Sequence, residues 1–154
     1  TRTGYGQVTR VQASNGNFLG FYYDTFGHIT EAYTGDGRRL YYRYDKHGDL
    51  IEVTRPDASV IRYDYGRMTE TVGSTTEVVS NHLIIRETKP GGRVLENDYD
   101  SQRRVTEQRA TVGTGLVPVR NATFIYNHTT ETDGSKTGHT LVRDAYNREG
   151  RYDY

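Results

Sequence analysis

The stretch YDTFGHI at residues 23–29 returns as YDKHGDL at residues 44–50, 21 positions later. The match extends backwards, because Leu19 falls on Leu40 at the same offset. Several matches at one spacing indicate an internal repeat, and periods of roughly 20–50 residues are typical of chains that stack one small structural unit. We therefore interpret residues 1–154 as a single array of about seven repeats.

Later copies of the tyrosine–aspartate pair vary more. In the third copy Tyr65-Gly66 stands where the pair is expected, and Tyr63-Asp64 lies two residues earlier. We expect degenerate repeats around residues 66–88 and 101–122, where Arg103 replaces the turn glycine. The residues predicted to form the structural corners are Tyr23, Asp24, Gly27, Tyr44, Asp45, Gly48, Tyr63, Asp64, Tyr99, Asp100, Tyr126, Asn127, Tyr146, Asn147 and Gly150.

Each copy combines turn chemistry with two short strands. In residues 24–27 an aspartate opens a four-residue turn and a glycine ends it, because the carboxylate accepts a backbone N–H two residues on and glycine tolerates positive φ. The second corner of each repeat has different chemistry, with Pro56 and Pro90 suited to a turn and Asn15-Gly16 suited to a tight hairpin. Two turns per repeat leave strands of about five to seven residues.

Between the corners the side chains alternate. Leu40, Tyr42 and Tyr44 share one face of a predicted strand, while Tyr41 and Arg43 share the other. Helical spacing is not sustained in any segment. The sequence therefore predicts an all-β fold, a repetitive ribbon of antiparallel β-hairpins that is nearly helix-free.

Composition excludes several classes of function. Lys and Arg number 20 and Asp and Glu also number 20, so the net charge gives no reason to expect nucleic acid or an anionic membrane as the main partner. No apolar run approaches the roughly 18 residues of a membrane span, so we expect no membrane insertion. Cysteine is absent, which removes disulfides, thiol nucleophiles and thiolate metal sites.

The polar residues do not form a recognisable catalytic or metal-binding motif. Most aspartates recur at turn positions, which favours turn stabilisation over paired catalytic carboxylates. The histidines lack the short spacings of metal ligands, and no nucleophile elbow is present. We expect no catalytic residues, no metal and no cofactor, and hence no enzyme. Asn121 and Asn127 begin glycosylation acceptor triplets, and whether they are modified is left open.

At the Tyr-Asp corners the sequence resembles the YD-repeat family, also called Rhs repeats, which includes bacterial Rhs and polymorphic-toxin shells, toxin-complex shells and teneurins. The family motif reads roughly Tyr-Asp-x-x-Gly-Arg-Leu, and residues 44–50 fit it well. The resemblance implies a β-ribbon that spirals into a hollow shell, of which this chain would be a fragment. It also implies a secreted or cell-surface protein whose shell encapsulates or presents a C-terminal effector. The Asp-Pro pair of the bacterial self-cleavage motif is absent.

Two interpretations of the tyrosines stay open. Periodic tyrosines favour a structural role in the sheet, but rings on an exposed face could also bind sugars. The candidate ligand-facing residues are Tyr41, Arg43, Glu52 and Arg62. The alternative function is therefore an extracellular adhesion module that binds carbohydrate or another cell-surface protein. Expected partners otherwise are the rest of the array or an encapsulated effector, and exposed strand edges allow self-association.

Overall fold

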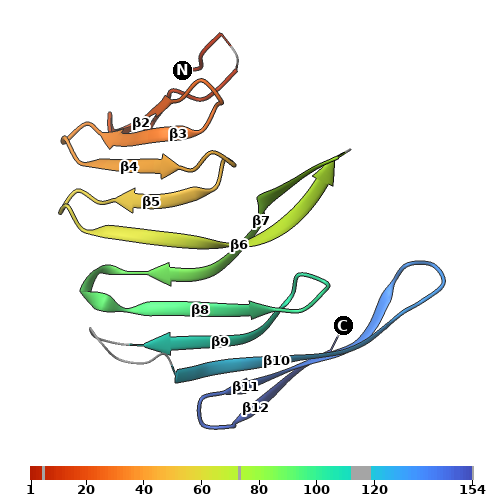
Figure 1. The fold of residues 1–154 in the computed structure, drawn as a ribbon. Helices are drawn as coiled ribbons and strands as arrows, with labels where there is room; N and C mark the ends of the chain where they lie inside the picture. Colours follow the sequence, from red (N-terminus) through yellow and green to blue (C-terminus); the bar gives the residue numbers. More distant parts are fainter. Residues whose placement is uncertain (5, 73, 112–118, 154) are drawn as a thin grey trace. The chain divides into compact units, whose positions relative to one another are not determined.

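The computed structural model describes residues 1–4, 6–72, 74–111 and 119–153, and almost all of them lie in antiparallel β-strands or tight turns (Figure 1). This confirms the predicted all-β ribbon. A short 3₁₀ turn occupies Pro90–Gly92. The strands are β1 (Arg10–Gln12), β2 (Phe18–Tyr23), β3 (Ile29–Thr34), β4 (Arg39–Tyr44), β5 (Leu50–Thr54), β6 (Val60–Val72), β7 (Thr75–Thr88), β8 (Val94–Tyr99), β9 (Val105–Thr111), β10 (Val119–Thr130), β11 (Lys136–Asp144) and β12 (Glu149–Asp153).

Each strand is hydrogen-bonded to the strands that precede and follow it in the sequence, so the strand order runs from β1 to β12 without a crossover. The chain forms two compact units, Thr1–His82 and Leu83–Tyr154. Part of the stretch expected to be degenerate, residues 112–118, lies outside the described residues. Consecutive antiparallel pairing follows from the short turns, which return the chain directly beside the strand it has just left.

One turn geometry serves nearly every corner. At Asp24 the backbone N–H bonds the carbonyl of His28 at 2.9 Å, and the N–H of Gly27 bonds the carbonyl of Asp24 at 3.2 Å. The fourth residue takes a positive φ, which makes a type I turn with a glycine-type bulge. The same pair of bonds is found at the corners that open with Thr3, Ala13, Asp24, Thr34, Asp45, Arg55, Asp100, Glu131 and Asp144.

The expectation of two different corner types is therefore corrected. Ala13 and Arg55 open turns of the same geometry as Asp24, because Pro56 at the second position suits the φ of a type I turn. At the fourth position Ala58 and Arg103 adopt φ values of 62° and 65° although they are not glycines. The corner at Lys89 does differ, since two successive glycines with positive φ shape it.

In the first unit the two faces of the sheet differ in character. Leu40, Tyr42 and Tyr44 of β4 are half-buried, whereas Tyr41 and Arg43 are exposed. Cross-strand pairing carries this division to the neighbouring strands, since Tyr42 lies opposite Val53 and Arg43 lies opposite Glu52. Among the described residues the buried hydrophobic side chains are Ala32 and Ile61, and no large side chain is fully buried. The core is thus one thin face of a sheet.

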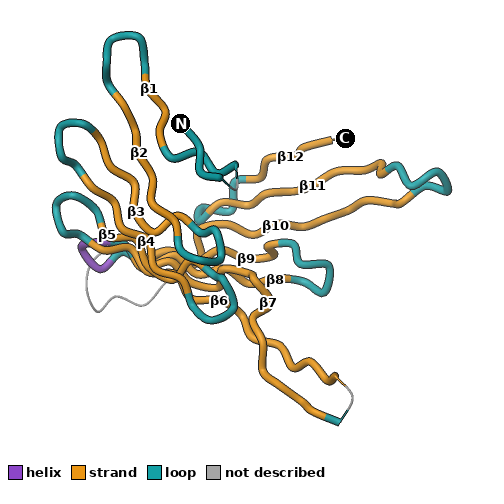
Figure 2. The backbone as a smooth tube through the Cα atoms, turned by 90° about the horizontal axis from the view of Figure 1, so that it is seen from above, coloured by secondary structure: helices purple, strands orange, loops and turns teal. Residues whose placement is uncertain are grey.

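Two predicted corners are not corners. Tyr63 and Asp64 lie inside β6, and Tyr126 and Asn127 lie inside β10, so in both places the strand continues. The physical reason is local, because neither Asp64 nor Asn127 is followed three residues later by the positive-φ residue that the turn requires. The resulting hairpins of β6 with β7 and of β10 with β11 are longer than the others (Figure 2).

The last predicted corner is shifted by three residues. Asp144 opens the turn, and Asn147 occupies its fourth position with a φ of 60°. Tyr146 therefore lies within the turn and Gly150 lies in β12, rather than at the positions predicted for them. Asparagine tolerates the left-handed region better than most residues, which explains why it can replace glycine there.

Candidate functional site

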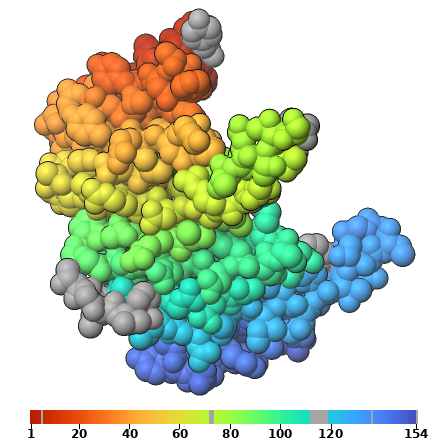
Figure 3. All heavy atoms as spheres, in the orientation of Figure 1, coloured from red at the N-terminus to blue at the C-terminus, as the bar shows by residue number. Residues whose placement is uncertain are grey.

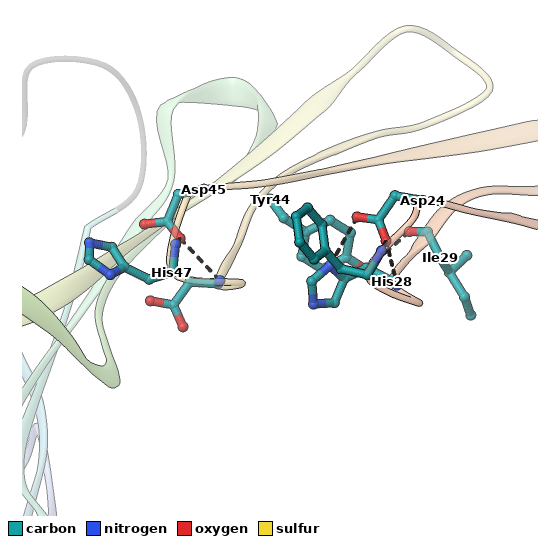
Figure 4. A network of polar contacts seen from close by, with 8 residues as sticks. Asp24, His28, Ile29, Tyr44, Asp45 and His47 are labelled. Atoms are coloured by element: carbon teal, nitrogen blue, oxygen red, sulfur yellow. Dashed lines mark hydrogen bonds and ion pairs between the residues drawn. The ribbon is translucent and has the colours of Figure 1, made fainter.

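The tyrosine that precedes a corner is hydrogen-bonded to the previous corner. The hydroxyl of Tyr44 donates to the carbonyl of Ile29 at 3.0 Å, 15 residues earlier. The ring of Tyr44 also stacks on His28, with 4.6 Å between the ring centroids. Figure 4 shows Tyr44 between the corner that opens at Asp24 and the one that opens at Asp45. One side chain thus ties two successive corners together.

The same contact recurs along the chain, and we call it the tyrosine latch. In each case a half-buried tyrosine reaches the carbonyl beside its cross-strand position on the preceding strand, at 2.7 to 3.0 Å. A hydroxyl so placed has a hydrogen-bond partner, which is the usual arrangement for a buried tyrosine. The latches are Tyr23 to Val8, Tyr44 to Ile29, Tyr65 to Leu50, Tyr99 to Ile84 and Tyr126 to Val105.

Where a corner opens with aspartate, the carboxylate caps the turn. Oδ1 of Asp100 accepts the N–H groups of Gln102 and Arg104, both at 2.9 Å, and Oδ2 accepts Nε of Arg104 at 2.8 Å. The backbone N–H and the guanidinium of Arg104 hold the pKa of Asp100 below its usual value. Asp24 with His28 and Asp144 with Arg148 repeat the arrangement. The carboxylates are thus committed to structure.

One corner breaks this rule. Four residues after Asp45, where the other corners that open with aspartate carry His28, Arg104 or Arg148, the chain carries Asp49, whose side chain is only 6% exposed. A residue from β7 compensates, since Nδ1 of His82 lies 2.6 Å from Oδ1 of Asp49. Burial raises the pKa of Asp49, but hydrogen bonds from Ser80 and His82 outweigh it and the pKa is lowered. His82 itself takes a φ of 58° to reach this position.

Ser80, His82 and Asp49 include the residue types of a hydrolytic triad, but their geometry differs. The Ser80 hydroxyl accepts the backbone N–H of His82 at 3.1 Å, and its proximity lowers the pKa of Asp49. A nucleophilic serine instead needs its hydroxyl on the imidazole nitrogen that faces away from the carboxylate. The group therefore holds β7 against the corner and does not activate a nucleophile. In the part of the chain that the structure describes, no group of three or more His, Asp or Glu residues could hold a metal ion.

The candidate ligand-facing residues lie together on the exposed face of the first unit. Tyr41 is 47% exposed and lies opposite Glu31 of β3. Glu52 lies between two arginines, with Oε2 at 3.1 Å from Arg43 and 3.0 Å from Arg62. Hydrogen bonds from Arg43, followed by the charges of both arginines, lower the pKa of Glu52. Glu52 is thus the centre of a cross-strand ion-pair ladder with Arg43 and Arg62 on this exposed face.

The sequence did not reveal an aromatic cluster on that same face. Tyr33 packs over Gly20, where even a Cβ would come within 2.4 Å of the ring. Tyr22 stacks on Tyr33 with 5.3 Å between centroids and is 54% exposed, and Phe18 meets Tyr33 edge-on at 5.9 Å. The guanidinium of Arg39 lies 5.4 Å from the centre of the Tyr33 ring. A glycine opposite a tyrosine would have predicted this cluster, but Gly20 and Tyr33 are seen to be opposite each other only once the register of β2 on β3 is known.

The predicted corner residues divide into two groups. Tyr23, Asp24, Gly27, Tyr44, Asp45, Gly48, Tyr99 and Asp100 take part in latches and corner turns as described, while the positions around residues 63, 126 and 146 do not form the corners predicted there. Tyr65 and Asp144 carry the contacts instead. The 21-residue spacing from Tyr44 was the signal for Tyr65. The arginine four residues after the aspartate, as in Asp100 and Arg104, was the signal for Asp144. Asn121 and Asn127 both lie on β10 with exposed side chains.

Comparison with known families agrees with this geometry. The family described as RHS Repeat matches residues 44–77, from the latch tyrosine Tyr44 through the long strand β6 into β7. The match confirms the resemblance drawn from the Tyr-Asp corners. No curated protein matches the chain. Within the described ranges, no helix is long and apolar enough to cross a membrane.

Proposed function

Since the chain carries the RHS repeat, a structural repeat, we propose that it is a wall segment of a β-shell in a secreted or cell-surface protein. The shell would encapsulate or present a C-terminal effector. The role is mechanical: the segment provides a continuous hydrogen-bonded surface and performs no chemistry. The observation that carries the proposal is the tyrosine latch, which recurs with one geometry in both units.

The latch suits a wall because it resists bending and fraying at the turns, where a single-layer sheet has few other contacts. Backbone ladders hold each strand to its neighbours, but a sheet with a thin core has few side-chain contacts that resist bending or fraying at the turns. A hydroxyl bonded to the preceding corner fixes successive turns side by side. Corner aspartates whose charges are satisfied by their own turns leave few unpaired groups at that edge.

The test is protease protection in the full-length protein that contains this segment. If the wall encloses an effector, the Tyr44→Ala variant should expose that effector to protease faster than the wild-type protein does. The matched control is Tyr41→Ala, which removes an exposed ring from the same strand. Equal rates of effector cleavage in the wild type and both variants would contradict enclosure by this wall.

A second candidate function is adhesion through carbohydrate, and the aromatic cluster favours it. Tyr22 and Tyr41 present exposed rings on the polar face, and the neighbouring Glu31 and Arg39 are ion-paired with each other and can still share hydrogen bonds with hydroxyl groups. The Tyr33 ring is held rigidly by Gly20, so the platform would lose little entropy on binding. Calorimetric titration with glycans tests this: Tyr22→Ala should abolish binding, while Tyr152→Ala on β12 should not. No binding by the wild type at millimolar glycan would exclude it.

A further inference from the structure

The hairpin of β6 and β7 extends beyond its neighbours. The β5 ladder covers only Val60 to Arg62 of β6, and the β8 ladder covers only Arg86 to Thr88 of β7. We call residues 66–71 and 75–81 the hairpin extension. Figures 1 and 2 show it passing the ends of β4 and β5, and Figure 3 shows it as a projection from the surface of the first unit. It arises because the corner after Tyr65 is missing, so the strand continues straight on.

The root of the hairpin extension is fixed to the first unit. His82 is bonded to the buried carboxylate of Asp49 at 2.6 Å, and Arg67 lies 3.6 Å from Asp45. Gly66 leaves room for the side chain of Asn81, since a Cβ there would lie 2.6 Å from its amide nitrogen. The extension is therefore held in a defined position at its base while its outer part projects.

Both outer edges of the hairpin extension are open. Beyond Tyr65 on β6 and before His82 on β7, the only strand partner in the described residues is the other arm of the hairpin. Natural proteins usually block such edges with proline, with bulges or with charged side chains, above all lysine, and the charged residues of the extension are Arg67, Glu70 and Glu77. The extension is rich in threonine and valine and contains no proline or lysine. Unpaired backbone groups on a β-favouring strand are a template for an added strand.

The negative charges of Glu70 and Glu77 determine which kind of peptide strand can pair with the hairpin extension. The hydroxyls of Thr71 and Thr76 lie 3.1 Å apart, so these residues face each other and Glu70 comes opposite Glu77. Both glutamates line a hollow of about 170 Å³ together with Thr75 and Val79. Among the described residues neither glutamate has an ion-pair partner, although like charges directly opposite each other destabilise a hairpin. Exposed apolar area lies beside them, since Met68 is 42% exposed.

We propose that the hairpin extension is a docking site for an extended peptide segment that carries basic side chains. The segment adds as a strand to an open edge, through backbone hydrogen bonds, and its lysine or arginine side chains pair with Glu70 and Glu77. A second copy of this chain fits less well, because pairing two extensions would bring four glutamates together. This site is independent of the wall function, since the extension projects beyond the ladders that build the wall.

The experiment uses two synthetic probes of seven residues, Lys-Val-Thr-Lys-Val-Thr-Lys and its counterpart with Glu in place of each Lys. Titration of the isotopically labelled chain, followed by amide NMR shifts and hydrogen exchange, gives affinity and location. We expect the basic peptide to bind and to slow exchange within residues 66–71 or 75–81. The double variant Glu70→Gln/Glu77→Gln should weaken that binding about three- to tenfold, the scale of two partly exposed ion pairs.

The matched control is Glu149→Gln/Asp153→Asn, which removes two carboxylates from the edge strand β12 and should leave the affinity unchanged. Unchanged exchange rates in β3 to β5 of each variant show that the fold is retained. Three results would overturn the proposal: equal binding of both peptides, protection at β1 or β12 instead of the hairpin extension, or concentration-dependent dimerisation through the extension without peptide.

Discussion

At the scale of single residues, the latch hydroxyl is the contact that distinguishes this sheet from a plain meander. Replacing Tyr44 with Phe keeps the ring on His28 and removes only the bond to the carbonyl of Ile29. A net hydrogen bond contributes about 1 kcal/mol, so we expect Tyr44→Phe to lower the free energy of unfolding by about that amount. Urea denaturation measures it.

Tyr41→Phe is the control for this prediction, because the exposed Tyr41 hydroxyl bonds no residue that the structure describes. It should change stability by less than about 0.5 kcal/mol, as is usual for surface substitutions. If the two variants lost equal stability, the latch would not be a specific stabilising contact.

The fourth turn position offers a second residue-scale prediction. Ala58 holds a φ of 62°, a region that costs a non-glycine residue about 1–2 kcal/mol. Ala58→Gly relieves that strain and adds flexibility to the unfolded chain, so a net gain of about 0.5–1 kcal/mol is expected. Ala13, the first residue of its turn, does not have a positive φ, so Ala13→Gly should destabilise. Thermal unfolding of both variants would contradict the strain argument if their midpoints moved in the same direction.

The corner carboxylates predict how the fold responds to acid. Hydrogen bonds from the backbone N–H and guanidinium of Arg104 lower the pKa of Asp100 in the folded state relative to about 3.9 when unfolded. A lowered pKa contributes stability that is complete above about pH 4 and is lost as the pH falls through the folded value. Asp100→Asn should therefore be less stable than the wild type at pH 6, and the gap should close towards pH 2. Thermal midpoints measured across that range test this, and a gap that did not change with pH would refute it.

At the scale of an element, the length of β6 depends on a missing corner. Tyr65 makes its latch to Leu50, yet Gly66 follows it directly, without the aspartate and two spacer residues that precede Gly48 in the corner of Asp45. Inserting Asp-Lys-His between Tyr65 and Gly66 should restore a turn and shorten the strand. Amide exchange should then become fast at the new corner, and the contact between His82 and Asp49 should be lost.

The control for this insertion is the same three residues placed after Gly134, in a turn that already exists. It should lengthen a loop at small cost without changing any strand. A β6 that stayed continuous after the insertion at residue 65 would show that cross-strand packing, and not turn chemistry, sets its length.

At the scale of the whole molecule, each unit is stabilised mainly by contacts between neighbouring repeats. Tyr44 directly precedes the Asp45 corner and is bonded to Ile29 and stacked on His28 at the Asp24 corner, so Tyr44→Ala should loosen strands on both sides of β4. Hydrogen exchange should lose protection in β3 and in β5 to β6 as well as in β4. Loss confined to residues 35–50 would contradict stacking of repeats as the source of stability.

Much of the fold was readable from the sequence because turns are local. Asp24 and Gly27 lie within one turn and need only their own hydrogen bonds, so repeated copies of that pattern predicted the strands between them. The corner at Asp144 was misplaced because Asn147 took the glycine position, and the breaks at Tyr65 and Tyr126 were misread because a tyrosine was present without its turn. The aromatic cluster on Gly20 was missed because it depends on the register of two strands.

The sequence by itself determined that this chain is a β-repeat array, where most of its turns lie, and which tyrosines recur. A four-residue turn depends only on neighbouring residues, and the period of about 21 residues is visible when the sequence is compared with itself. The tertiary structure alone decided which carbonyl each tyrosine reaches, that His82 compensates Asp49, and that a lost corner becomes a projecting hairpin. The physical reason is register. Beside the corners of Asp24, Asp45 and Asp100 a bulge shifts the pairing by one residue, and a side chain finds its partner only after those shifts have accumulated across the strands.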